Sequence, residues 1–122
     1  MALTAAELRP YLQRLAREGR VVTYRDVAAE LSVPPPRSIH RVVEALERTM
    51  EEDAAAGRPF AAALVVSKTR DGLPAPGFFA KARELGRDPG AEQGPDAAAF
   101  HRAELDALLG GASAQEEFGR NG

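Results

Sequence analysis

The chain has 122 residues, of which 44% are hydrophobic and 28% charged, the mixture of an ordinary globular domain. It contains no cysteine, so disulfides, thiolate metal sites and thiol nucleophiles are excluded. No apolar run approaches the roughly 18 residues that a membrane span needs, and the N-terminus lacks the basic-then-apolar pattern of a secretory signal. We therefore expect a single cytoplasmic domain.

The formal net charge of −2 is spread unevenly along the chain. Residues 1–90 carry 14 Lys and Arg against 12 Asp and Glu, whereas residues 91–122 carry 2 against 6. A balance this close to neutral does not indicate a strongly basic nucleic-acid binder, but such binding requires only a local basic face. The acidic C-terminal part is either a solubilising tail or a segment that could lie over such a face.

The first predicted element is a helix that ends at Gly19. Thr4 and Glu7 have the spacing of a capping box, and apolar residues follow at helical spacing from Leu8 to Leu15. Pro10 lies inside this pattern and removes one backbone donor. We expect it either to kink the helix or to move its start to about residue 9.

Two further helices are predicted on either side of a proline-rich turn. Thr23 is the expected N-cap of a short helix, with Asp26 three residues farther on. Three consecutive prolines, at 34–36, must end that helix, and a longer one then runs from about Arg37 to Ala56. Its buried stripe is predicted to consist of Ile39, Val42, Val43, Leu46 and Met50. This order is that of a helix-turn-helix.

The hydrophobic period changes in the second half of the chain. The segment 61–67 is predicted to be a strand, and Asp71-Gly72 is a turn signal that also suits a hairpin. A short helix over 78–85 follows. A helix-turn-helix followed by a strand and a turn predicts an α+β fold, a small winged helix-turn-helix domain over residues 1–90.

The C-terminal part is expected to add one helix to this domain. After a polar Gly/Pro linker, Asp96 is the expected cap of a helix that ends at Gly110-Gly111. We assign residues 91–111 to this C-terminal helix and residues 112–122 to a disordered tail.

The exposed face of the helix from Arg37 is the candidate DNA-binding surface. Arg37, Arg41, Glu44 and Arg48 share one face at helical spacing. In a recognition helix, residues at the N-terminal end usually reach base edges. The same pattern also fits a solvated face on which Glu44 pairs with Arg41 or Arg48. The candidate DNA-binding residues are Tyr24, Arg25, Arg37, Ser38, His40, Arg41, Arg48 and Lys68.

Other chemistry finds little support in the sequence. The two histidines, His40 and His101, are far apart and lack a carboxylate pattern around them, so we predict no metal site, no cofactor and no catalytic residue. A small hydrolase or nuclease that uses His40 and nearby carboxylates is a third hypothesis. Phe78 and Phe79 are predicted to be core residues, and exposure of either would instead indicate a partner surface.

The segment 19–28, Gly-Arg-Val-Val-Thr-Tyr-Arg-Asp-Val-Ala, resembles the Gly-x-Val-x-Thr-Tyr-x-x-Ile-Ala segment of the alkyltransferase-like DNA-binding domain. DNA alkylguanine alkyltransferases share this domain with non-catalytic relatives. A proline-containing turn and an arginine open the family's recognition helix, as Pro34-Pro35-Pro36-Arg37 does here. The resemblance covers about residues 10–80 and implies a winged helix that binds double-stranded DNA. It also implies that Tyr24 disturbs the DNA backbone during nucleotide flipping and that Arg37 fills the vacated stack.

The same resemblance places Ala62, Ala63 and Leu64 where the family has its reactive Cys, its His and its Arg. Without a thiol there is no alkyl acceptor, so the transfer reaction is chemically excluded. The replacement of this segment also argues against a lesion pocket. What could survive is DNA binding alone.

A second likeness is to small uncharacterised bacterial proteins, on segments 23–28, 64–66 and 72–78, and it implies no activity. We therefore predict a non-enzymatic protein that binds double-stranded DNA, with arginines docking electrostatically and the helix from Arg37 in the major groove. The alternative is a protein-interaction module on the same scaffold, with no nucleic-acid role. In that case segment 74–79 and the acidic tail would contact a protein partner.

Overall fold

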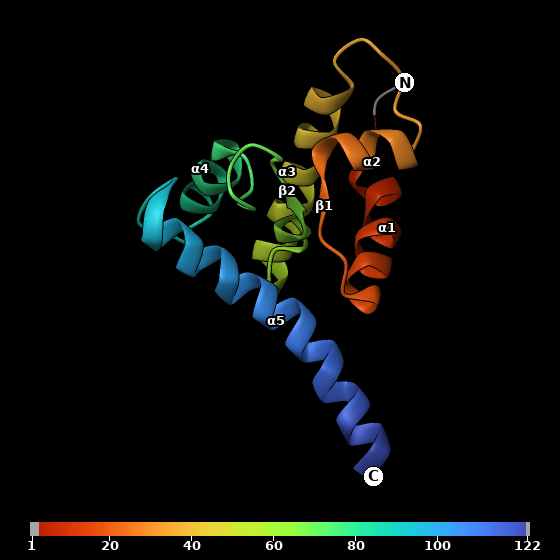
Figure 1. Cartoon of the computed structure of the whole chain (residues 1–122), viewed down its shortest axis with the longest axis vertical. Coiled ribbons are helices and arrows are strands. Elements are labelled where there is room, and N and C mark those ends of the chain that lie inside the picture. The colour runs from red at the N-terminus through yellow and green to blue at the C-terminus, as the bar shows by residue number, and fades with distance from the viewer. Residues whose placement is uncertain (1–2, 122) are drawn as a thin grey trace.

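The structure, a computed structural model, describes the backbone of residues 3–121 and the side chains of residues 3–110. Within that part, the chain is mostly helical with one small parallel sheet, an α+β arrangement (Figure 1). The elements are α1 (Ala5–Glu18), β1 (Val22–Thr23), α2 (Tyr24–Glu30), α3 (Ser38–Ala56), the 3-10 turn η1 (Ala61–Leu64), β2 (Val65–Val66), α4 (Pro76–Glu84) and α5 (Gly94–Asn121). None of the described helices is long and apolar enough to cross a membrane.

The predicted starts of the first two helices are confirmed. The Thr4 hydroxyl accepts from the Glu7 amide while the Glu7 carboxylate accepts from the Thr4 amide, and Thr23 and Asp26 form the same reciprocal pair. Two satisfied amides at each end explain why these helices begin where they do. The expectation that Pro10 moves the first start is wrong, because α1 begins at Ala5 and continues through the proline.

The strands β1 and β2 pair in parallel, with Val22 opposite Val65 and Thr23 opposite Val66. Parallel strands need a long crossover connection, which α2 and α3 supply here (Figure 1). Both strands run in the same direction, so the residues that follow them emerge at the same edge of the sheet. The start of α2 and the loop after β2 are therefore neighbours.

The predicted strand over 61–67 is largely wrong. Ala61–Leu64 form the turn η1, and only Val65–Val66 are extended and paired. Alanine has no branched side chain to favour a strand, and Ala61, Ala62 and Ala63 are buried at a crowded contact between α1, α3 and α5. Their small size suits this packing.

The turn at Asp71-Gly72 is confirmed, but no hairpin accompanies it. Both residues have positive φ, 52° and 80°, and the Leu73 amide donates to the Arg70 carbonyl at 3.0 Å. The next residues lead into α4, and the part of the chain that the structure describes contains no antiparallel return strand. The α+β class therefore holds, whereas a winged hairpin is not formed by residues 67–76.

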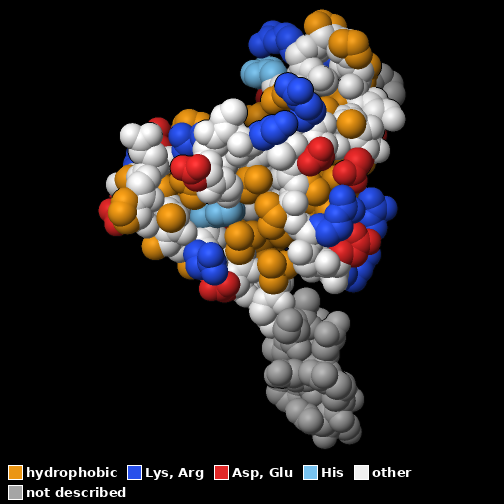
Figure 2. Space-filling view, in the orientation of Figure 1, with side chains coloured by type: hydrophobic (Ala, Val, Ile, Leu, Met, Phe, Trp, Pro, Cys, Tyr) orange, Lys and Arg blue, Asp and Glu red, His pale blue; other side chains and the backbone are white. Residues whose placement is uncertain are grey.

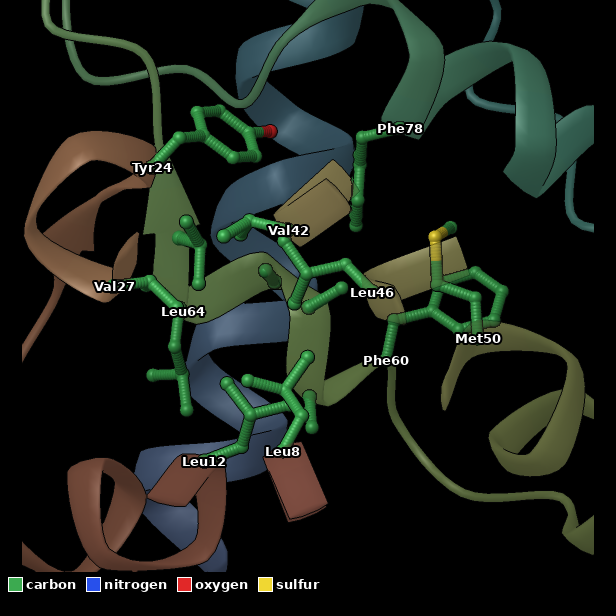
Figure 3. Close-up of a cluster of buried hydrophobic side chains, with 14 of the residues drawn as sticks. Leu8, Leu12, Tyr24, Val27, Val42, Leu46, Met50, Phe60, Leu64 and Phe78 are labelled. Atoms are coloured by element: carbon green, nitrogen blue, oxygen red, sulfur yellow. The ribbon is translucent and has the colours of Figure 1, made fainter. Parts of the chain in front are cut away.

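The core lies where α1, α3, α4 and the segment η1–β2 meet. Figure 3 shows side chains of α1 and α3 pointing toward those of Phe60 and Leu64 at its centre. Phe78 and Phe79 are 5% and 0% exposed, which confirms that they are core residues. The prediction for Ile39 is wrong, since it is 41% exposed. The first turn of α3 extends beyond the elements that cover its later turns (Figure 1).

The helix α5 packs across the body and shares its core. Ala97 and His101 are buried, and the Glu104 carboxylate accepts from the Phe60 amide at 2.9 Å. The helix runs past Gly110-Gly111, where the sequence predicted its end. The predicted disordered tail over 112–122 lies outside the residues whose side chains are described.

A buried carboxylate on α3 joins the N-terminal helix to the second half of the chain. Asp53 is 1% exposed and accepts from Arg9 Nη1 at 2.9 Å, from Arg58 Nε at 3.0 Å and from the Ala61 amide at 3.0 Å. Arg9 also donates to exposed Glu52 at 2.8 Å. A buried charge of this kind is tolerated only when its partners are in place.

We expect Asp53→Ala to lower the free energy of unfolding by about 3 kcal/mol, because it leaves Arg9 without its buried partner and the Ala61 amide unsatisfied. Glu52→Ala is the matched control, since it removes the exposed partner of the same arginine and should cost less than about 1 kcal/mol. Urea denaturation of both variants measures the difference. Equal losses would show that burial of Asp53 contributes nothing.

His101 supplies a second buried polar contact. Its Nε2 lies 2.8 Å from the Ala63 carbonyl, which can only accept, so Nε2 carries the proton. Burial lowers the pKa of His101 from its ordinary value, opposing the effect of this hydrogen bond. The folded protein therefore holds the imidazole neutral at a pH where the unfolded chain already binds a second proton.

This difference makes stability depend on pH. Because the unfolded state binds the extra proton more readily, the free energy of unfolding should fall as pH decreases below about 6.5. In His101→Gln, an amide N–H can replace Nε2 as donor without titrating. We expect the urea midpoint of wild type to drop more than that of His101→Gln between about pH 7 and pH 5. Parallel pH profiles would contradict the assignment.

Candidate nucleic-acid interface

A groove opens at the sheet edge where both strands end. It has a volume of about 710 Å³ and is open to solvent. We call it the basic groove, and its lining residues are Thr23, Tyr24, Arg25, Asp26, Ile39, Ser67, Lys68 and Thr69. Three segments contribute to it: the start of α2, the first turn of α3 and the loop after β2. Figure 2 shows Lys, Arg and His side chains at the end of the molecule where α3 begins.

The loop that carries Lys68 is held by its own hydrogen bonds. The Ser67 amide donates to the Leu73 carbonyl at 2.8 Å, which closes the loop around the Asp71-Gly72 turn. The Arg70 guanidinium donates to the Pro74 carbonyl at 3.0 Å and also to the Glu92 carbonyl. The position of Lys68 relative to α2 is thus set by backbone contacts rather than by a charge partner of its own.

The charge of the basic groove is net positive. Within the described residues, neither Arg25 nor Lys68 has an ion-pair or hydrogen-bond partner for its side chain. The only carboxylate among the lining residues, Asp26, accepts from the Thr23 amide at 3.0 Å. The hydrogen bonds from the Thr23 backbone and side chain lower the pKa of Asp26, and nearby Arg20 and Lys68 lower it further. The Asp26 carboxylate therefore takes part in capping the N-terminus of α2.

The outer face of α3 adds further cations. Arg37 is the N-cap and is exposed, and Arg48 is exposed about 16 Å farther along the helix axis. Arg41 is half-buried and donates to the Pro34 carbonyl at 3.4 Å. Ser38 is the first residue of the helix and is half-buried. The predicted exposure of Arg37 and Arg48 is confirmed.

The partner of Glu44 differs from the one expected. Instead of Arg41 or Arg48, His40 Nε2 lies 3.6 Å from a Glu44 carboxylate oxygen, four residues away on the same helix. Both side chains are about half exposed. Arg48 therefore forms no salt bridge with Glu44, although the Glu44 carboxylate still contributes its negative charge to this face of the helix.

Tyr24 lies mostly in the core, although it borders the basic groove. Figure 3 shows Tyr24 among the side chains of the core, where it is 9% exposed. Its hydroxyl accepts from the Ala75 amide at 2.8 Å. Burial raises the pKa of this hydroxyl, while the Ala75 hydrogen bond opposes the change. The contact ties the start of α2 to the start of α4. In this arrangement the ring is not presented to a ligand.

A cavity beside Tyr24 includes Ala62, the position where the resemblance puts a reactive cysteine. Its volume is about 10 Å³, room for no more than one water molecule. The walls are mostly apolar, and Glu47 is the carboxylate among them. Burial raises the pKa of Glu47. A cavity this small cannot hold a nucleobase, in line with the argument against a lesion pocket.

The other candidate chemistry is not assembled by the fold. Among residues 3–110, no three His, Asp or Glu side chains come together as metal ligands would. His40 has Glu44 beside it and stands on an exposed helix face, whereas His101 is buried on α5. The two histidines therefore lie in different environments and do not form a common site.

Comparison with protein-family models, with curated proteins and with solved structures found no match for this chain. The candidate site therefore rests on its own geometry.

Three of the residues that line the groove, Tyr24, Arg25 and Lys68, were predicted from the sequence as DNA-binding residues, whereas Ile39, Ser67 and Thr69 were not. Ile39 was assigned to the core because its spacing from Val42 fits the buried stripe. Ser67 and Thr69 were missed because a loop position carries no periodic signal. Only the parallel pairing of β1 with β2, which joins residues more than 40 apart, brings this loop to α2.

Arg37 and Ser32 both hold the left-handed conformation, with φ of 62° and 53°. Glycine adopts this region without the cost of about 1–2 kcal/mol that other residues bear, although it gains entropy in the unfolded chain. We expect Arg37→Gly and Ser32→Gly each to raise the free energy of unfolding by about 0.5–1 kcal/mol. Chemical denaturation tests both variants, and a loss of stability in either would contradict the expectation.

Proposed function

We propose that this protein binds double-stranded DNA without catalysing a reaction. The observation that carries the proposal is the basic groove, which Arg25 and Lys68 line from separate segments, neither of them with a salt bridge in the described part of the chain. Cations without salt bridges can replace the counterions condensed on a phosphate backbone, and the release of those counterions into solution favours binding. The resemblance to the alkyltransferase-like domain supports the same function.

In this proposal the first turns of α3 enter the major groove. Arg25 and Lys68 contact phosphates beside that helix, and Arg37 and Arg48 contact the DNA along it. The α2–α3 pair supplies the helix-turn-helix, and the loop after β2 takes the place that a wing would have. Tyr24 acts here by supporting the start of α2 rather than by touching DNA.

The alternative, a protein-interaction module, would be favoured by an exposed aromatic residue in segment 74–79, and none is exposed there. Exposure of Phe78 or Phe79 was expected for a partner surface over 74–79, and both are buried. Pro74 in the same segment is also buried. This alternative is therefore kept as an outcome of the binding experiment.

Fluorescence anisotropy with a labelled random-sequence duplex, from about 50 to 200 mM salt, tests the proposal. The binding constant of wild type should fall steeply with salt. Arg25→Ala/Lys68→Ala should weaken binding and reduce the slope of log K against log salt by about two, since each lost phosphate contact removes about 0.9. Arg37→Gly should also weaken binding, whereas Ser32→Gly should not.

The matched control is Arg17→Ala/Arg102→Ala, which removes the same net charge from α1 and α5. Both side chains are exposed, and Arg17 lies at the end of α1 away from the start of α3 (Figure 1). If this control flattens the slope as much as the groove variant, DNA contacts the protein by charge alone and the groove assignment is wrong. Absence of binding by folded wild type at about 50 mM salt would refute DNA binding and leave a protein partner.

A further inference from the structure

Ile39 is an exposed apolar residue among polar and charged neighbours. It is one of two large hydrophobic side chains that are well exposed in the described part of the chain, and the other is Val21 at 43%. A single exposed aliphatic residue is ordinary by itself. Ile39, however, lines the basic groove, where the remaining walls are Arg25, Lys68, Asp26 and four hydroxyl-bearing side chains.

The position of Ile39 on its helix makes this exposure informative. It is the second residue of α3, in the turn that our proposal places against the base edges. Val42, one turn later, is fully buried, so Ile39 does not continue the packing of the stripe into the body. An exposed aliphatic side chain gains free energy only by contact with another apolar group.

The major groove offers one apolar group in unmodified DNA, the C5 methyl of thymine. Cytosine and uracil present hydrogen at that position. With Arg25 and Lys68 on phosphates, Ile39 in the same groove would lie near the base edges, and the charge of the groove favours a polyanion as its occupant. We infer that Ile39 is a specificity-determining residue that recognises a thymine methyl, an inference that rests on the proposed binding of duplex DNA.

The test begins with a duplex pool that has about 12 randomised base pairs, from which wild type selects its bound fraction. The preferred duplex is then made with each thymine replaced by uracil, one at a time, which removes only the methyl. At one position we expect binding by wild type to weaken roughly three- to fourfold, the effect of one lost methyl contact. Ile39→Ala should bind the thymine and uracil duplexes equally.

Val21→Ala is the matched control, because it shortens the other exposed aliphatic side chain outside the groove. It should keep the full preference for thymine, and circular dichroism should show that both variants are folded. The inference is overturned if no sequence is enriched, if every uracil replacement is silent, or if Ile39→Ala keeps the preference. Duplex binding with steep salt dependence but no uracil effect overturns this inference alone, whereas loss of all duplex binding overturns the proposed function as well.

Discussion

The carboxylate of Asp53 holds together parts of the chain that lie far apart in sequence. Removal of its charge from water costs several kcal/mol, and the guanidinium of Arg9 from α1 and that of Arg58 offset this cost at about 3 Å. The same carboxylate accepts from the Ala61 amide, the first residue of η1. Since η1 leads directly into β2, this hydrogen bond helps to fix where β2 begins and hence its register against β1.

That register determines the candidate site. Each strand contributes only two paired residues, so the pair depends on the packing around it, and Val22 and Val65 are both buried. Parallel strands deliver the residues after Thr23 and after Val66 to one edge, where Arg25 and Lys68 line the basic groove. A shift of one residue in β2 would turn its side chains to the opposite face of the pair and move the loop away from α2.

Local interactions explain which parts could be predicted from the sequence. The caps at Thr4 and Thr23 were predictable because donor and acceptor are three residues apart. The role of Asp53 was not, since Arg9 precedes it by 44 residues and an acidic residue near the end of a helix ordinarily faces water. The segment after Phe60 was misassigned because alanine signals neither turn nor strand, and its structure follows from the tight packing around it.

The charged residues of the site could be predicted from the sequence, but the exposure of Ile39 and the position of the loop after β2 could not. Arg25 and Lys68 come from α2 and the loop after β2, whereas Ile39 comes from α3. Contacts of the two cations with phosphates would set affinity and its salt dependence, while a methyl contact by Ile39 would set base preference. In the proposed complex these side chains come from separate elements but line one groove, so a double-mutant cycle is what would separate their contributions to affinity and to base preference. The proposed mode of binding thus assigns affinity to the two cations and base preference to Ile39 on one small scaffold.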